Sequence, residues 1–203
     1  MNSQANSERA LRKTAYHEAG HAVAAVFLGT SLDYVTILAR NHEYGRSRGE
    51  TRMNDLTAIT AETQRNLWIG IFHDIIRAAS ARYSQAQFTR LSKADEAGFG
   101  SDEEPIDVLA RMLFRKEDAA ATQTSAVARS IAQKMMSSPH GKVAVHAVAH
   151  KLMAYRSLRG SEVVEIVQRS PFLHFQQGQK VEDMMFIWEN KREPFTPSEF
   201  DDF

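Results

Sequence analysis

The chain has 203 residues, with 25 Lys and Arg side chains that balance 25 Asp and Glu, and no cysteine. A net charge of zero gives no global attraction for nucleic acid or for an anionic membrane. The lack of cysteine excludes disulfides and thiolate metal sites, leaves histidine and carboxylate as metal ligands, and is typical of a reducing cytoplasm. The longest apolar run, Ala22–Leu28, is too short to cross a bilayer, and the N-terminus lacks the apolar stretch of a secretory signal. We therefore expect one cytoplasmic domain with no membrane contact and no nucleic-acid partner.

The first part of the chain reads as a long helix followed by a small amount of β-structure. A helix is predicted over residues 8–28, with Ser7 as its N-cap and Gly29 at its end. β-Branched and aromatic residues then predict a strand over residues 32–38. A polar loop over 41–49 and a second short strand near 50–53 follow.

From residue 54 onward the pattern is helical. Asp55 is a suitable cap for a helix over 56–88, whose apolar residues recur at three- and four-residue spacing. A loop over 92–100 comes next. Ser101 then starts a helix, because Glu104 three residues later completes a capping-box pattern. The remaining predicted helices cover 117–136, 140–155 and 161–167, and the breaks between them are Ser137-Ser138-Pro139 and Leu158-Arg159-Gly160.

Together these elements predict a mainly α-helical protein, an α+β fold with one small β-sheet. Residues 1–6 are a polar lead, and residues 7–169 form the predicted domain. The periodic pattern is lost over residues 170–203, where aromatic residues are scattered among prolines and polar residues. We expect this segment to be a tail that packs on the body or is partly disordered.

The run Tyr16-His17-Glu18-Ala19-Gly20-His21-Ala22 lies inside the first predicted helix. Four residues is close to one helical turn, so His17 and His21 project from the same face and can bind one zinc ion. Glu18 is poorly placed as a third ligand on that face but can reach a water held by the metal. A helix with two surface histidines is the alternative, but the apolar residues around the motif favour burial, and buried ring nitrogens need partners. The pattern is typical of zinc hydrolases in which the glutamate is the general base.

A catalytic zinc site usually has three protein ligands, so a third ligand is needed. The extended motif with a third histidine is excluded, because Phe27 occupies that position. Glu62, on the next predicted helix, is one candidate. Asp102 follows a glycine-containing stretch and opens a helix, where backbone amides and the helix dipole favour a carboxylate, and Glu103 and Glu104 compete for the same role. Spacing alone favours Asp102 as a simple helix-start residue.

The segment 14–23 closely resembles the active-site helix of the FtsH-type ATP-dependent zinc metalloproteases. In that family a strand containing Val-Thr-Ile follows, and Val35-Thr36-Ile37 is similar. A later Ala-Ala-Glu run is matched by Ala78-Ala79-Ser80, with serine in place of glutamate. The family's glycine-containing loop, aspartate and Ala-Arg pair are similar to Gly100-Ser101-Asp102 and Ala110-Arg111. The resemblance covers about residues 10–170 and implies that Asp102 is the third zinc ligand beside His17 and His21.

The resemblance implies a stand-alone helical zincin, similar to the FtsH peptidase domain, that holds one Zn²⁺ per chain and hydrolyses peptide bonds. The sequence contains no Gly-x-x-x-x-Gly-Lys-Ser/Thr phosphate loop, so we expect no use of ATP and substrates that are peptides or already unfolded segments. A zinc-containing binding or regulatory module without general proteolytic activity is the alternative, because the serine at position 80 removes a group that could support the metal site. The first predicted strand is expected to offer an edge on which an extended peptide pairs, through Val35, Thr36, Ile37 and Leu38.

Overall fold

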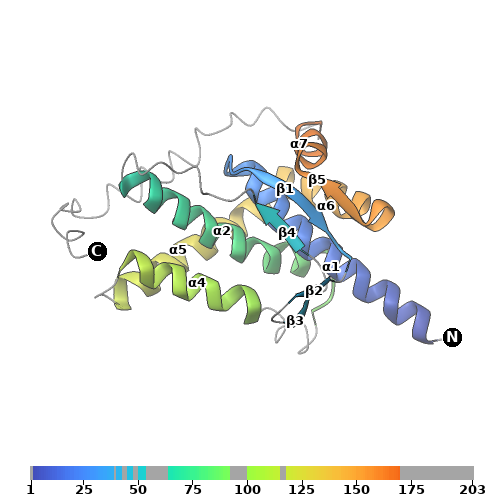
Figure 1. Cartoon of the computed structure of the whole chain (residues 1–203), viewed down its shortest axis with the longest axis horizontal. Coiled ribbons are helices and arrows are strands. Elements are labelled where there is room, and N and C mark those ends of the chain that lie inside the picture. The colour runs from blue at the N-terminus through green and yellow to red at the C-terminus, as the bar shows by residue number, and fades with distance from the viewer. Residues whose placement is uncertain are drawn as a thin grey trace. The chain divides into compact units, whose positions relative to one another are not determined.

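The computed structural model describes residues 2–38, 40–42, 45–47, 50–53, 64–91, 100–114 and 118–169 (Figure 1). Within these ranges the protein is mainly helical with a small antiparallel sheet, as the sequence predicts. The helices are α1 (Asn2–Phe27), α2 (Gln64–Phe88), α4 (Gly100–Leu113), α5 (Asp118–Ser137), α6 (Pro139–Tyr155) and α7 (Gly160–Gln168). The strands are β1 (Leu32–Thr36), β2 (Arg40–His42), β3 (Gly45–Ser47), β4 (Glu50–Met53) and β5 (Ser157–Arg159).

The helix boundaries agree best with prediction in the second half of the chain. Helix α6 shows the local cause, since the Ser138 side chain accepts a hydrogen bond from the Gly141 amide at 2.9 Å and Pro139 occupies the first turn. Helix α1 begins before Ser7, so the prediction of Ser7 as its N-cap is wrong. The predicted start of the second helix, most of the predicted loop over 92–100 and the tail over 170–203 lie outside the described residues.

The sheet has the strand order β4-β1-β5, with both neighbours antiparallel to β1. Strand β5 occupies a stretch that was predicted only as a break between helices. Its pairing places Val35 opposite Leu158 and Thr36 opposite Ser157, while β4 covers the other side of β1. Strand β1 is therefore the central strand, and the prediction that it offers a free edge for a peptide is wrong.

The residues at the end of this segment form further hydrogen bonds. The Ile37 amide donates to the Arg156 carbonyl at 2.9 Å, the Thr36 hydroxyl donates to the same carbonyl at 3.1 Å, and the Leu38 amide donates to the Thr36 hydroxyl at 3.2 Å. A second correction concerns residues 41–49, predicted as a loop, because β2 and β3 pair there as an antiparallel hairpin.

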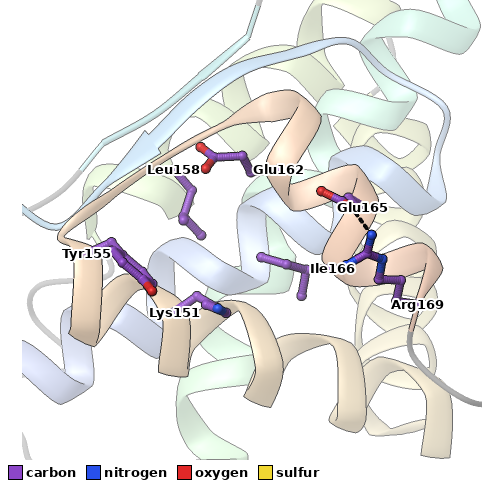
Figure 2. A pocket seen from close by; sticks show the side chains of 7 residues that line it. All are labelled: Lys151, Tyr155, Leu158, Glu162, Glu165, Ile166 and Arg169. Carbon is purple, nitrogen blue, oxygen red and sulfur yellow. Dashed lines mark ion pairs between the residues drawn. The ribbon is translucent and has the colours of Figure 1, made fainter.

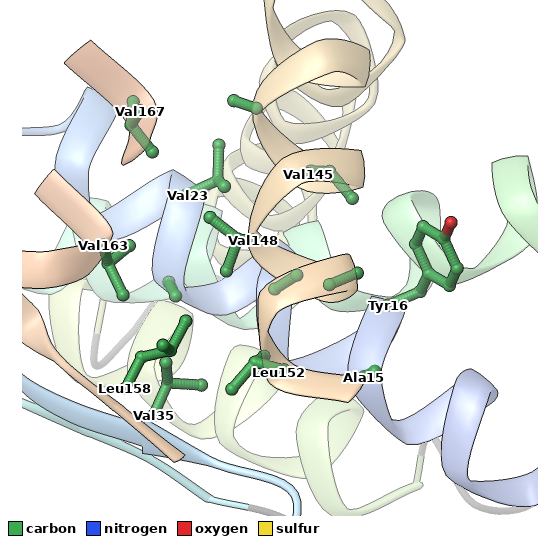
Figure 3. Packing of buried hydrophobic residues seen from close by; sticks show 14 of the residues in the cluster. Ala15, Tyr16, Val23, Val35, Val145, Val148, Leu152, Leu158, Val163 and Val167 are labelled. Carbon is green, nitrogen blue, oxygen red and sulfur yellow. The ribbon is translucent and has the colours of Figure 1, made fainter. Parts of the chain in front are cut away.

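Helix α1 is the centre of the main hydrophobic core, where it packs against α2, α6, α7 and β1 (Figure 3). The helix is rich in alanine and valine on this side, and Val23 is fully buried. Tyr16 is 1% exposed, stacks on Phe88, and its hydroxyl lies 2.8 Å from Nδ1 of His146, so its polar end has a partner. Each fully buried Val or Leu side chain contributes about 1.5–3 kcal/mol. Further members of this core are Val35, Val145, Val148, Leu152, Leu158, Val163 and Val167.

Helices α1 and α2 approach each other most closely at Gly20, which lies between the two histidines of the motif. A Cβ atom at this position would lie 2.8 Å from the Ala81 Cα and 2.9 Å from the Ser80 carbonyl oxygen. The Ser84 hydroxyl bridges the same contact by donating to the Tyr16 carbonyl at 2.6 Å. Glycine is required here because of this close approach, and the metal motif is held firmly on α2 as a result.

Among the described residues, no helix combines the length and the apolar character that a membrane span requires.

Candidate metal centre

Three side chains that are distant in sequence meet where α1 faces the first turn of α4. His17 and His21 lie one turn apart on α1, and Asp102 lies on α4. The Nε2 atom of His17 is 3.0 Å from Oδ2 of Asp102, and Nε2 of His21 is 3.6 Å from Oδ1. One ligand atom from each residue lies within 4.8 Å of the other two, an arrangement that could hold a metal ion. It is the only such group of His, Asp and Glu in the described part of the chain.

The contacts of Asp102 fit a cation better than a simple hydrogen bond. Its Oδ2 atom is buried and has no hydrogen-bond partner among the described residues, although His17 Nε2 is only 3.0 Å away. Leaving a buried carboxylate oxygen without a partner costs free energy that a bound cation would remove. Two ligand atoms of a tetrahedral zinc lie about 3.3 Å apart, which the two observed contacts bracket. Two imidazoles and one carboxylate are a donor set suited to zinc and to other divalent ions.

Helix α2 fixes the orientation of the His21 ring through the ring nitrogen that does not face Asp102. Its Nδ1 atom lies 3.0 Å from the Arg77 carbonyl oxygen. A carbonyl only accepts, so Nδ1 carries the proton in this contact, and Nε2 is the ring nitrogen that faces Asp102. Backbone carbonyls often hold metal-ligating histidines in this way. The side chains of His17, His21 and Asp102 are 18%, 10% and 22% exposed, so each is largely but not fully buried.

At His17 and Asp102 the neighbouring charges shift the pKa in the direction opposite to the shift caused by burial. Burial of His17 lowers its pKa, but the contact with Asp102 and the negative charges of Glu18 and Asp102 outweigh this, and the pKa is raised above 6.5. Burial of Asp102 raises its pKa, but the contacts with His17 and His21 outweigh it, and the pKa lies well below its usual value.

Glu18 lies on α1 directly after His17 and is buried, with 6% of its surface exposed. Its charge raises the pKa of His17, which places the carboxylate close to the ligand cluster. It is not part of the group whose ligand atoms converge. This is the separation between ligands and a neighbouring carboxylate that the spacing of the motif predicts.

The competing candidates for the third ligand have other positions. Glu62 lies outside the described residues. Glu103 points its two carboxylate oxygens at arginine side chains, and Glu104 is exposed. Among the carboxylates of α4, Asp102 is the residue that reaches both histidines.

Two groups on α2 that contact the histidines were missed by sequence reasoning. The carbonyl of Arg77 leaves no signal in the sequence, because every residue has one. Gln85 is 5% exposed, and its side-chain oxygen accepts a hydrogen bond from the His17 ring, which helps to raise the pKa of His17. A polar residue on the apolar side of a helix was a signal that could have been noticed. Ser80, at the position of the family's glutamate, is fully buried and donates to the Ile76 carbonyl at 2.8 Å.

A second concave region lies between α6, β5 and α7, with a volume of about 360 Å³ (Figure 2). Leu158 and Ile166 give it an apolar part, and Arg169 forms an ion pair with Glu165 at its rim. The Glu162 carboxylate accepts a hydrogen bond from the Arg159 amide at 2.7 Å and so caps α7. These side chains have structural roles, and the chemistry of the described residues is concentrated at the cluster of His17, His21 and Asp102.

No protein-family model matches this chain, and no curated protein matches it either.

Proposed function

We propose that this protein is a zinc-dependent peptidase. The observation that carries the proposal is the meeting of His17, His21 and Asp102, with the buried Glu18 beside them on α1. The resemblance of the motif helix to that of the FtsH-type peptidases supports the same function. It also supports zinc over other divalent ions that a histidine-carboxylate site accepts.

The residues of the site have distinct roles in this proposal. His17, His21 and Asp102 would hold the zinc ion, and His21 is kept in the required tautomer by the Arg77 carbonyl. When bound, zinc would supply Lewis-acid polarisation of the scissile carbonyl and a lowered pKa for a coordinated water. Glu18 would accept the proton from the attacking water and deliver it to the leaving amine.

The proposed substrates are peptides and segments that are already unfolded. No Gly-x-x-x-x-Gly-Lys-Ser/Thr phosphate loop occurs within these 203 residues.

The proposal is tested by zinc content and cleavage measured on the same preparations. We expect about one zinc per chain in the wild type and its loss in His17→Ala. Glu18→Gln should keep zinc but lose cleavage of an unstructured, fluorescently labelled protein by about 10²–10⁴-fold, the usual contribution of a general base. Glu104→Gln is the matched control, because it makes the same change at an exposed position.

Each outcome has a separate meaning. A Glu18→Gln protein that holds zinc and cleaves at the wild-type rate would exclude Glu18 as the base. A wild type that takes up no zinc would overturn the metal site itself. Zinc without turnover on any unfolded substrate would instead favour a zinc-containing binding module.

A further inference from the structure

The residue after Asp102 joins three helices through its two carboxylate oxygens. Glu103 Oε1 is 3.1 Å from Nη1 of Arg82 on α2, and Glu103 Oε2 is 2.5 Å from Nη2 of Arg129 on α5. The same Arg129 nitrogen lies 3.5 Å from Oδ1 of Asp107, one turn further along α4. We call Arg82, Glu103 and Arg129 the arginine clamp.

The arginine clamp belongs to a continuous series of contacts that connects α1, α2 and α4 around the candidate metal centre. Gly20, between the two histidines, packs on Ala81 of α2. The next residue on α2, Arg82, holds Glu103. The residue before Glu103, Asp102, reaches back to the histidines on α1. The position of the carboxylate relative to the imidazoles is thus set by α2, which contacts both sides of the site.

The first turn of α4 has no other strong anchor among its described side chains. The buried apolar residues that fix this helix, Ile106 and Ala110, lie one and two turns beyond Asp102. Helix ends fray when nothing holds them, and a ligand in a fraying turn spends part of its time away from the metal. The two ion pairs of Glu103 act at the turn that carries the ligand.

We propose that the arginine clamp positions Asp102 for metal binding, with Arg82, Glu103 and Arg129 acting as positioning residues. This inference rests on the proposed metal site and assigns it three residues outside the ligand set. Ion pairs that are partly exposed contribute little to global stability. The effect of the clamp is therefore expected in metal affinity and coordination geometry, and much less in the melting temperature of the metal-free protein.

The test compares Zn²⁺ affinity, measured by competition with a chromophoric chelator, among full-length variants. Glu103→Gln and Arg129→Met should weaken zinc binding by about 10–100-fold, the usual effect of losing a group that orients a ligand. Arg129→Lys keeps the positive charge and should recover part of the loss. Arg169→Met breaks an exposed ion pair on α7 and is the matched control that should bind as the wild type.

The visible spectrum of the Co²⁺-substituted protein provides a second measurement. Its absorption bands report coordination geometry, and they should change in Arg129→Met and Glu103→Gln but stay unchanged in Arg169→Met. If Arg129→Met fails to fold, the nearly isosteric Glu103→Gln decides the question.

The failures of the two proposals are distinguishable. Wild-type zinc affinity and an unchanged cobalt spectrum in both clamp variants would overturn the positioning role and leave the metal site intact. A lower melting temperature with unchanged zinc affinity would likewise assign the clamp a purely structural role. A wild type that binds neither Zn²⁺ nor Co²⁺ would remove the proposed function, and the positioning role with it.

Discussion

Replacing Gly20 with alanine places a methyl group at the closest contact between α1 and α2. The new carbon would lie 2.2 Å from the Ser84 hydroxyl, 2.8 Å from the Ala81 Cα and 2.9 Å from the Ser80 carbonyl oxygen. Ordinary carbon-carbon contacts are about 3.5–4.0 Å, so the helices must separate by about 1 Å. The Ser84 side chain could rotate away, but the other two atoms belong to the backbone and move only with α2.

The expected cost follows from three terms. Overpacking of this kind costs about 1–3 kcal/mol, and loss of the Ser84 hydrogen bond to the Tyr16 carbonyl adds about 1 kcal/mol. The higher helix propensity of alanine offsets about 1 kcal/mol of this destabilisation. We therefore expect a net loss of about 1–3 kcal/mol, or a fall in melting temperature of roughly 2–12 °C for a chain of this size.

The assay is thermal unfolding followed by circular dichroism in the presence of a chelator, so that metal binding does not contribute. Gly70→Ala is the control, because Gly70 is also inside a helix but a Cβ there meets nothing within 4 Å. It should stabilise the protein by about 1 kcal/mol. Adding Ser84→Ala to Gly20→Ala should not restore stability, since the two backbone contacts remain. If Gly20→Ala stabilised the protein as Gly70→Ala does, the close approach of α1 and α2 would be refuted.

Two further predictions concern pH and the core. In the metal-free protein the pKa of Asp102 is lowered, so this group adds stability above pH 3.8 that is lost as the pH falls below that value. The pKa of His17 is raised, so this group adds stability below pH 6.5 that is lost as the pH rises beyond that value. The difference in urea midpoint between the wild type and Asp102→Asn should therefore be largest near pH 5 and shrink on both sides, and a pH-independent difference would contradict the pairing. Leu152→Ala should lower the free energy of unfolding by about 2–5 kcal/mol, because Leu152 is fully buried. Val108→Ala, at a position that is 52% exposed, is the control and should change the free energy of unfolding by about 0.5 kcal/mol or less in the same urea titrations.

The helices of the second half were predictable because their signals are local. The helices predicted over 117–136, 140–155 and 161–167 agree closely with α5, α6 and α7, and the serine-proline break before α6 contains the hydrogen-bonding cap found in the structure. Helix α1 shows the limit of such signals. Ser7 has the chemistry of a cap, but the helix extends past it, because a capping residue favours a helix start without requiring one.

The strand β5 could not be predicted from its own residues. Its three residues alternate, with only Leu158 buried, but three residues are too few to distinguish a strand from a break between helices. The segment is a strand because β1 lies beside it, more than a hundred residues earlier in the chain. The error about a free edge on β1 has the same origin, since an edge is a property of the neighbours and not of the strand.

One part of the candidate metal centre was predictable from local sequence, and another part depends on tertiary packing. The four-residue spacing of His17 and His21 is local, and it places both side chains on one side of α1. The approach of Asp102 depends on the packing of α4 against α2, which spacing alone does not encode. That is why spacing favoured a plain helix start at this position, and why the resemblance to a family was needed to name the aspartate.

The pairing of β1 with β5 has a consequence for the order in which the protein can be completed during synthesis. The Ser157 hydroxyl donates to the Val35 carbonyl, and 122 residues separate the two. A ribosome that adds about 5–20 residues per second needs roughly 6–24 s to produce that interval. Throughout this time the buried side of α1 around Val23 lacks its partners on α6 and α7, which lie more than a hundred residues later in the chain. The motif helix therefore emerges well before the helices that enclose it, and its apolar side stays uncovered over that interval.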